Sequence, residues 1–180
     1  DLSPQEMMQY INQRFRAENF PEDYFICLLL FVVDLETYQV TYVNSGFQSL
    51  PLVIKNGKLN QLKTSELPIS LAISSEAYQF AEDSFYLEPE DAILACTDGL
   101  VEEENPAGEM YGLDRITQQF AANASCPPQL IIDWIIDDLC EFAALPQQDD
   151  ITLLVIKREK IKNRFTIQLK SNYAHLETVK

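Results

Sequence analysis

The sequence predicts an α+β sandwich, in which antiparallel sheets are flanked by a few helices. The chain has 180 residues, 47% of them hydrophobic, which is enough for one domain with a sizeable core. Most of its apolar segments are short, strand-sized runs separated by turn residues, and only three segments show helical spacing. Many antiparallel strands with a few helices packed outside them define this class.

Three helices are expected. Ser3-Pro4 followed by Glu6 is a typical helix start, and apolar residues recur at helical spacing from there to about Arg16. Two further helices are predicted at about 113–122 and 128–143. The buried stripe of the last helix, with the only Trp as a core residue, is expected to consist of Leu130, Ile131, Trp134, Ile135 and Leu139.

The first half of the chain is expected to contain two hairpins. Residues 24–33 are continuously apolar, as in a strand covered on both faces, and 38–44 alternates as the hairpin partner. Asn56-Gly57 is a two-residue hairpin turn that joins strands at 52–55 and 58–62. The polar stretch 64–75 is expected to be a loop.

The second half is expected to contain three strands. The predicted segments are 78–87, a short central strand at 92–96, and the alternating strand 151–157.

The formal charge of −15 argues against a nucleic-acid partner, because phosphates would be repelled. Residues 157–180 hold seven of the 13 basic residues and only two of the 28 acidic ones, so 1–156 carries a net −20. A strongly acidic surface of this kind can bind cations or can simply keep the protein soluble.

Other bulk features narrow the setting. The longest apolar run, 25–33, is too short to span a bilayer, so no membrane partner is expected. The four Cys show no C-x-x-C spacing, and Cys27 and Cys96 fall in apolar strands, which fits a reduced cytoplasmic location. The chain contains a single His, His175. We therefore expect neither a His-rich zinc site nor a Ser-His-Asp triad. The first residue is not Met, so we expect a piece of a longer protein.

Two acidic segments carry the candidate chemistry. Strand 92–96 delivers Asp98 and Gly99 into a turn, where the strand fixes the carboxylate and Gly lets the backbone leave sharply. Asp149 and Asp150 come directly before the strand that begins at Ile151. Asp149 lies 51 residues after Asp98. Hard carboxylate oxygens suit Mg²⁺ or Mn²⁺. An ordinary Asp-Gly turn and an acidic surface without a metal remain the alternatives.

These residues resemble the two late motifs of the metal-dependent Ser/Thr phosphatases, the protein phosphatase 2C (PPM) superfamily, in its SpoIIE-like bacterial branch. The two late motifs are Thr97-Asp98-Gly99 through Gly112 and Asp149-Asp150-Ile151-Thr152-Leu153. Weaker matches occur in the same order along the chain, at Leu2-Ser3-Pro4, Ile11-Asn12 and Val40 to Gly46, so the resemblance extends from about residue 2 to 157. The resemblance implies an α-β-β-α sandwich of the PPM type that here lacks its first strands.

The resemblance also implies a site and a reaction. In this family a carboxylate cluster holds two metal ions, Mn²⁺ or Mg²⁺, which activate a water for attack on phosphoserine or phosphothreonine. Asp98 and Asp149 match the late metal ligands, whereas Gly99 and Asp150 match positions that support the site. Glu102 and Gly112 match loop positions with an expected structural role.

The implied protein partner is a phosphorylated anti-sigma factor antagonist-like protein. The family's early acidic motifs have no counterpart here, Phe47 stands at a common His position, and Ser70 stands at a common Gly position. Two carboxylates alone should bind a cation weakly. We therefore expect either a phosphatase domain, weak in this piece, or a pseudophosphatase-like module that binds its partner. A homodimer covering an exposed sheet edge is also expected.

The predicted domain organisation is a phosphatase domain over 1–157 and a distinct tail over 158–180. Residues 163–169 form a good strand, and 171–180 could begin a helix. The tail resembles the opening of an anti-sigma, histidine-kinase-like domain. An extra edge strand with a frayed terminus is the alternative.

Overall fold

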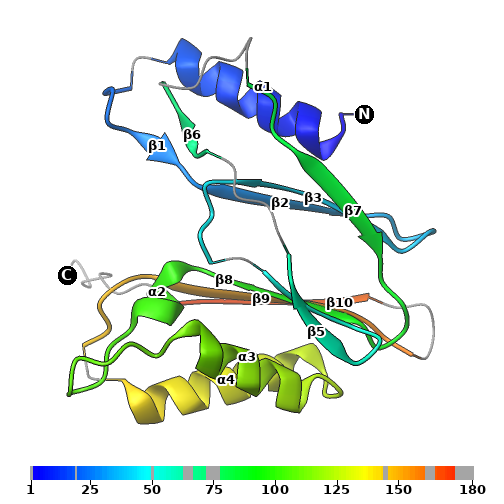
Figure 1. Cartoon of the computed structure of the whole chain (residues 1–180), viewed down its shortest axis with the longest axis vertical. Helices are drawn as coiled ribbons and strands as arrows, with labels where there is room; N and C mark the ends of the chain where they lie inside the picture. The colour runs from blue at the N-terminus through cyan, green and yellow to red at the C-terminus, as the bar shows by residue number, and fades with distance from the viewer. Residues whose placement is uncertain are drawn as a thin grey trace, which may run out of the picture. The chain divides into compact units, whose positions relative to one another are not determined.

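The computed structural model describes residues 2–18, 20–49, 51–62, 67–71, 78–143, 146–160 and 165–172. The chain forms two compact units (Figure 1). The first unit comprises Asp1–Leu50 and Lys63–Leu87, and the second comprises Pro51–Leu62 and Glu88–Lys180. Within the described residues, no helix is both long enough and apolar enough to cross a membrane.

The first unit is one helix on a three-stranded antiparallel sheet of order β2-β3-β7, with a separate β1-β6 ribbon. Its elements are α1 (Pro4–Ala17), β1 (Phe25–Ile26), β2 (Leu28–Val33), β3 (Gln39–Ser45), β6 (Ile69–Ser70) and β7 (Glu82–Tyr86). The apolar side of α1 packs into a core made of Met8, Phe15, Val43, Ile69 and Phe80.

The predicted start of α1 is confirmed in atomic detail. Ser3 Oγ accepts the Glu6 N–H at 3.2 Å, and Glu6 Oε2 accepts the Ser3 N–H at 2.7 Å. This reciprocal capping box satisfies two amide donors that the first helical turn leaves free, so the helix begins at Pro4.

Two strand predictions and one loop prediction in the first unit need correction. The run 24–33 is not one buried strand, because it breaks at Cys27, which is exposed, and Phe25 is 63% exposed. The strand predicted at 78–87 is limited to β7, because only its central residues pair with β3. The predicted loop at 64–75 contains β6; its residues 64–66 and 72–75 lie outside the described part of the chain.

The second unit is a five-stranded antiparallel sheet of order β10-β9-β8-β4-β5 with helices on one face. Its elements are β4 (Leu52–Lys55), β5 (Lys58–Gln61), β8 (Ala92–Cys96), α2 (Asp98–Glu102), α3 (Leu113–Asn123), α4 (Pro128–Phe142), β9 (Ile151–Arg158) and β10 (Phe165–Asn172). The β4–β5 hairpin turns at Asn56-Gly57 as predicted, with φ of 50° and 71°, which glycine and asparagine adopt readily.

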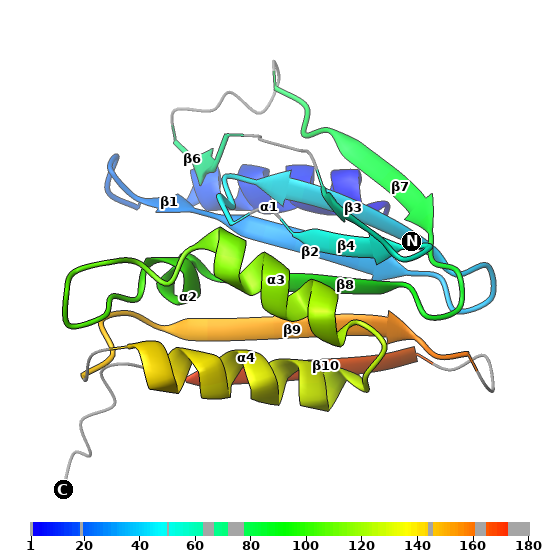
Figure 2. The ribbon, with the colours of Figure 1, turned by 60° about the horizontal axis from the view of Figure 1, so that its bottom comes forward.

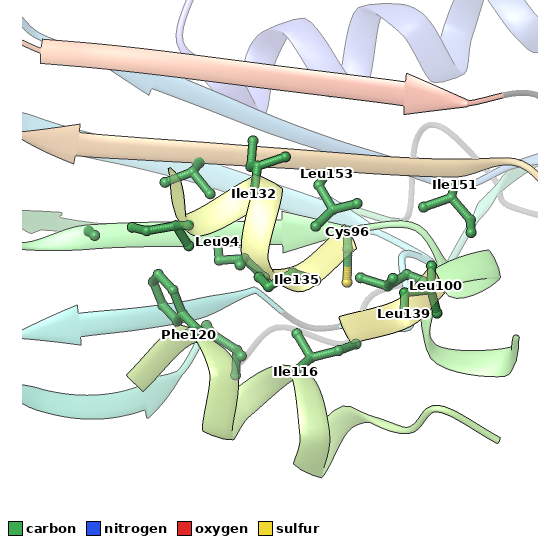
Figure 3. Packing of buried hydrophobic residues seen from close by; sticks show 14 of the residues in the cluster. Leu94, Cys96, Leu100, Ile116, Phe120, Ile132, Ile135, Leu139, Ile151 and Leu153 are labelled. Atoms are coloured by element: carbon green, nitrogen blue, oxygen red, sulfur yellow. The ribbon is translucent and has the colours of Figure 1, made fainter. Parts of the chain in front are cut away.

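The core of this unit lies between the sheet and helices α3 and α4 (Figure 3). Strands β8 and β9 contribute Leu94, Cys96, Ile151 and Leu153, and helix α2 adds Leu100. The buried residues of the two long helices are Ile116, Phe120, Ile131, Ile132, Ile135 and Leu139. This core fixes β8 and β9, the two strands that carry the acidic motifs.

The predicted stripe of α4 is partly wrong. Ile131, Ile135 and Leu139 are buried, but Leu130 is 43% exposed and Trp134 is 39% exposed. Successive helical residues are turned by about 100°, so the buried arc that includes Ile132 leaves Leu130 and Trp134 on the flank of the helix.

The strand predicted at 163–169 is present as β10, which pairs antiparallel with β9 along its whole length. The possible helix at 171–180 does not begin where it was predicted, because Ser171 and Asn172 belong to β10. Residues 173–180, which include His175, lie outside the described part of the chain. The assignment of 158–180 to a separate domain stays a prediction.

Candidate metal centre

The two acidic motifs meet where β8 ends and β9 begins, two neighbouring inner strands of the second unit's sheet. Strands β8 and β9 run antiparallel, with Cys96 paired to Leu153, so the end of β8 lies beside the start of β9 (Figure 2). The residues that follow Cys96 and those that precede Ile151 are therefore neighbours in space, although about 50 residues separate them in sequence.

Thr97 links the two segments by hydrogen bonds. Its backbone N–H donates to the Thr152 carbonyl at 3.0 Å, and its Oγ1 accepts the Thr152 N–H at 2.9 Å. The same hydroxyl donates to the Asp150 carbonyl at 3.0 Å. One side chain thus fixes the distance between the turn after β8 and the turn before β9.

Gly99 provides a second, steric link. A Cβ at this position would lie 2.5 Å from the Asp150 carbonyl oxygen and 3.4 Å from the Asp149 Cβ. Only glycine allows the two backbones to approach so closely, because a contact below 3.0 Å with backbone cannot be relieved by a side-chain movement. Gly99, which the sequence analysis singled out, therefore allows the backbone at the start of α2 to lie against the backbone of Asp150. This contact places Asp149 next to the start of α2.

Asp98 is the first residue of helix α2, which replaces the loop expected after β8. The side chains of Asp98, Asp149 and Asp150 are all exposed. Asp98 Oδ1 accepts the Gly99 N–H at 3.1 Å, and Asp149 Oδ1 accepts the Asp150 N–H at 2.7 Å. These local bonds orient both carboxylates and leave oxygens directed toward solvent.

The donor set fits a hard divalent cation in its chemistry, because it consists of carboxylate oxygens. It also falls short of a complete site. The described residues include no group of three or more His, Cys, Asp or Glu side chains able to hold a metal. Asp98 and Asp149 lie on neighbouring segments of the chain, and their role as metal ligands stays a prediction. Asp150 contributes its backbone carbonyl to the Thr97 bond, which accords with a supporting position.

Cys96, directly before this turn, does not supply a nucleophile. Burial and, to a smaller extent, the nearby Asp98 carboxylate raise the pKa of the Cys96 thiol to about 12. The thiol stays protonated at neutral pH and packs as a small apolar group.

The remaining motif positions have structural roles. Gly112 is the N-cap residue directly before helix α3 and donates its N–H to the Val101 carbonyl at 2.9 Å. Glu102 is the last residue of α2 and is exposed. In the first unit, the Asn44 amide exchanges hydrogen bonds with the backbone of Phe47. Ser70 lies in β6.

The bond network of Thr97 was not foreseen from the sequence. A Thr directly before Asp-Gly, together with a second Thr three residues after Asp149, is the signal that points to it. The signal is readable only once β8 and β9 are known to be neighbours.

The fold is that of PP2C-type phosphatase domains. It resembles the SiaA-PP2C domain of Pseudomonas aeruginosa with a TM-score of 0.71 and 20% identity, over 84% of this chain and 59% of that one. It also resembles the phosphatase domain of SpoIIE from Bacillus subtilis, presoaked with Mn, with a TM-score of 0.64 and 18% identity, over 89% of this chain and 68% of that one.

The chain belongs to the family described as stage II sporulation protein E (SpoIIE), whose profile matches residues 1–159. It is also 26% identical over 135 residues to Protein IcfG of Synechocystis sp.. The match covers 74% of this chain and 21% of IcfG, so the chain spans about a fifth of that relative.

Proposed function

We propose that this chain is part of a metal-dependent protein serine/threonine phosphatase domain that hydrolyses phosphoserine with the help of Mn²⁺ or Mg²⁺. The observation that carries the proposal is the convergence of Asp98 and Asp149, which the Thr97 hydrogen bonds and the Gly99 contact hold together. Membership of the SpoIIE family and the Mn-presoaked SpoIIE phosphatase domain support it.

In the proposed mechanism, Asp98 and Asp149 hold the cation through their solvent-facing oxygens. A bound divalent ion lowers the pKa of water and offsets negative charge on phosphoryl oxygens. Thr97 and Gly99 keep the two carboxylates at a fixed spacing, so that the ligands need not reorganise when the cation binds. Both carboxylates are exposed, which leaves the site accessible to a phosphorylated side chain on another protein.

The proposed substrate is a phosphorylated anti-sigma factor antagonist-like protein, and the proposed location is the cytoplasm. The support for both is the resemblance to SpoIIE-like regulators and the absence of a membrane-spanning helix from the described residues. The net charge of −15 disfavours nucleic acid as a partner.

A second candidate is a regulatory module that binds the phosphoprotein without hydrolysing it. It is favoured by the incomplete ligand set, since the described residues contain no group of three or more His, Cys, Asp or Glu side chains that could hold a metal ion. The Phe at position 47 and the Ser at position 70 point the same way. The two candidates differ in whether residues outside this chain complete the site.

Phosphate release from a phosphoserine-bearing protein of this class, measured with and without Mn²⁺, separates the candidates. The phosphatase proposal predicts slow release that requires Mn²⁺ and is lost in Asp149→Asn. The variant Asp137→Asn, an exposed acid on α4, removes the same charge and should keep the activity. Tight binding of the phosphoprotein without any release would overturn the phosphatase proposal in favour of the module.

A further inference from the structure

One acidic side chain near the candidate site differs from its neighbours. Glu103, the middle residue of the run Glu102-Glu103-Glu104 at the end of α2, is only 2% exposed, whereas Glu102 is exposed and Glu104 half-buried. Burial of a carboxyl group costs free energy unless hydrogen bonds compensate for the lost water. The position of Glu103 therefore calls for a specific contact.

That contact leads to the segment before Asp149. Glu103 Oε2 accepts the backbone N–H of Gln148 at 3.2 Å, and Gln148 is the residue directly before Asp149. The backbone carbonyl of Glu103 accepts the Tyr111 N–H at 2.8 Å, which anchors Glu103 itself. The second carboxyl oxygen, Oε1, is buried and has no hydrogen-bond partner within the described part of the chain.

We infer that Glu103 is a positioning residue for Asp149. Its carboxyl group connects the end of α2, the helix that starts at Asp98, to the turn that presents Asp149. Thr97 fixes this turn from its far side, at Asp150, and Glu103 fixes it from the near side, at Gln148. Groups that orient a metal ligand without touching the metal influence its affinity. The inference rests on the proposed function only in so far as Asp149 is a ligand.

Two conservative variants separate the reach of this side chain from its charge. Glu103→Gln keeps an oxygen at the same distance and removes the charge. Its NH₂ group would take the place of Oε1, which accepts no hydrogen bond from the described residues, so no hydrogen bond of that oxygen is broken. Glu103→Asp keeps the charge and withdraws the carboxyl group by one methylene. Glu102→Asp makes the same change at the exposed neighbouring position and serves as the control.

The first readout is amide hydrogen exchange of residues 147–150 in the metal-free chain. Because local opening controls exchange, Glu103→Asp should exchange about tenfold faster there, while Glu103→Gln and Glu102→Asp should match the wild type. Wild-type exchange in Glu103→Asp would overturn the inference. Equally fast exchange in the control Glu102→Asp would also overturn it, because the effect would then not be specific to the buried carboxyl group.

The second readout is the Mn²⁺ dissociation constant from calorimetry. We expect Glu103→Asp to bind about tenfold more weakly and Glu103→Gln to remain within about twofold of the wild type. If the wild type itself bound no Mn²⁺, the proposed function would fail. The exchange measurement would still decide whether Glu103 positions the turn.

Discussion

At the scale of single residues, Gly99 is a position where an added side chain would collide with the backbone of the candidate site. Its missing Cβ leaves room for the Asp150 carbonyl, which would otherwise lie 2.5 Å away. Gly99→Ala should therefore force the backbones apart and lower the free energy of unfolding by about 1–3 kcal/mol. Urea unfolding checks this, and an unchanged midpoint with an unchanged slope would show that the two segments are not held in contact.

Thr97 offers a test of the polar link. Thr97→Val keeps the shape of the side chain but loses both hydroxyl hydrogen bonds, so it leaves the Thr152 N–H and the Asp150 carbonyl without this partner. The expected loss of stability is about 1–3 kcal/mol. Thr97→Ser retains the hydroxyl and should lie much closer to the wild type. Equal stability of the Val and Ser variants would show that the hydroxyl contributes nothing.

Tyr42 gives a prediction for alkaline pH. Burial, the Asp83 charge and a hydrogen bond to Asp83 together raise the pKa of Tyr42 to about 12. The unfolded chain ionises this phenol near pH 10, so stability is full below that pH and falls as the pH rises toward 12. Tyr42→Phe should show a shallower decline in urea unfolding between pH 10 and 12; an identical slope would contradict the assignment.

At the scale of elements, the structure depends on how β9 is joined to the helices. Lys157 on β9 is almost fully buried, and its ammonium group donates to the carbonyls of Ala124 at 2.8 Å and Cys126 at 3.1 Å, at the end of α3. The ammonium group also lies near the C-terminal, negative end of the helix dipole, where a positive charge is stabilised. Glu90 lies 3.4 Å away as its ion-pair partner.

Lys157→Met should therefore destabilise the chain by about 1–3 kcal/mol, because two carbonyls lose their charged donor. Lys160→Met, which removes an exposed charge from the same region, is the control and should have a small effect. Thermal unfolding of the two variants side by side tests the difference. Equal melting temperatures would mean that Lys157 is not a structural link.

The elements that the sequence predicted correctly are those specified by local signals. The capping box at Ser3 and Glu6 fixes the start of α1, and Asn56-Gly57 fixes the β4–β5 turn, each within a few residues. The errors lie where burial depends on distant packing. Trp134 was placed in the core by its size and spacing, yet its exposure depends on where α3 and β9 contact α4.

At the scale of the whole molecule, the order of the strands determines which motifs meet. The sequence identified Asp98 and Asp149 as candidates from their positions at strand ends. The antiparallel pairing of β8 and β9 brings the end of β8 next to the start of β9 and so brings these two residues together. The contacts of Thr97 and the burial of Glu103 could not be predicted, because they depend on the register between those strands. A local sequence pattern does not determine how two strands about 50 residues apart pair with each other.

The acidic composition also acts at this scale. Residues 1–156 carry a net −20, so the approach of a divalent cation is favoured over the whole surface as well as at the candidate site. A useful measurement must therefore separate site binding from general attraction. A control that removes an equal charge elsewhere makes that separation.

Calorimetric titration of Mn²⁺ into the chain tests the central claim most directly. The variants are Asp98→Asn and Asp149→Asn, with Asp137→Asn as the charge-matched control. We predict Mn²⁺ binding that Asp137→Asn retains and that each of the other two variants weakens by about tenfold or more, since each removes a charged ligand. Equal Mn²⁺ affinity in all four proteins, or no binding with the fold intact by circular dichroism, would contradict a metal centre formed by Asp98 and Asp149.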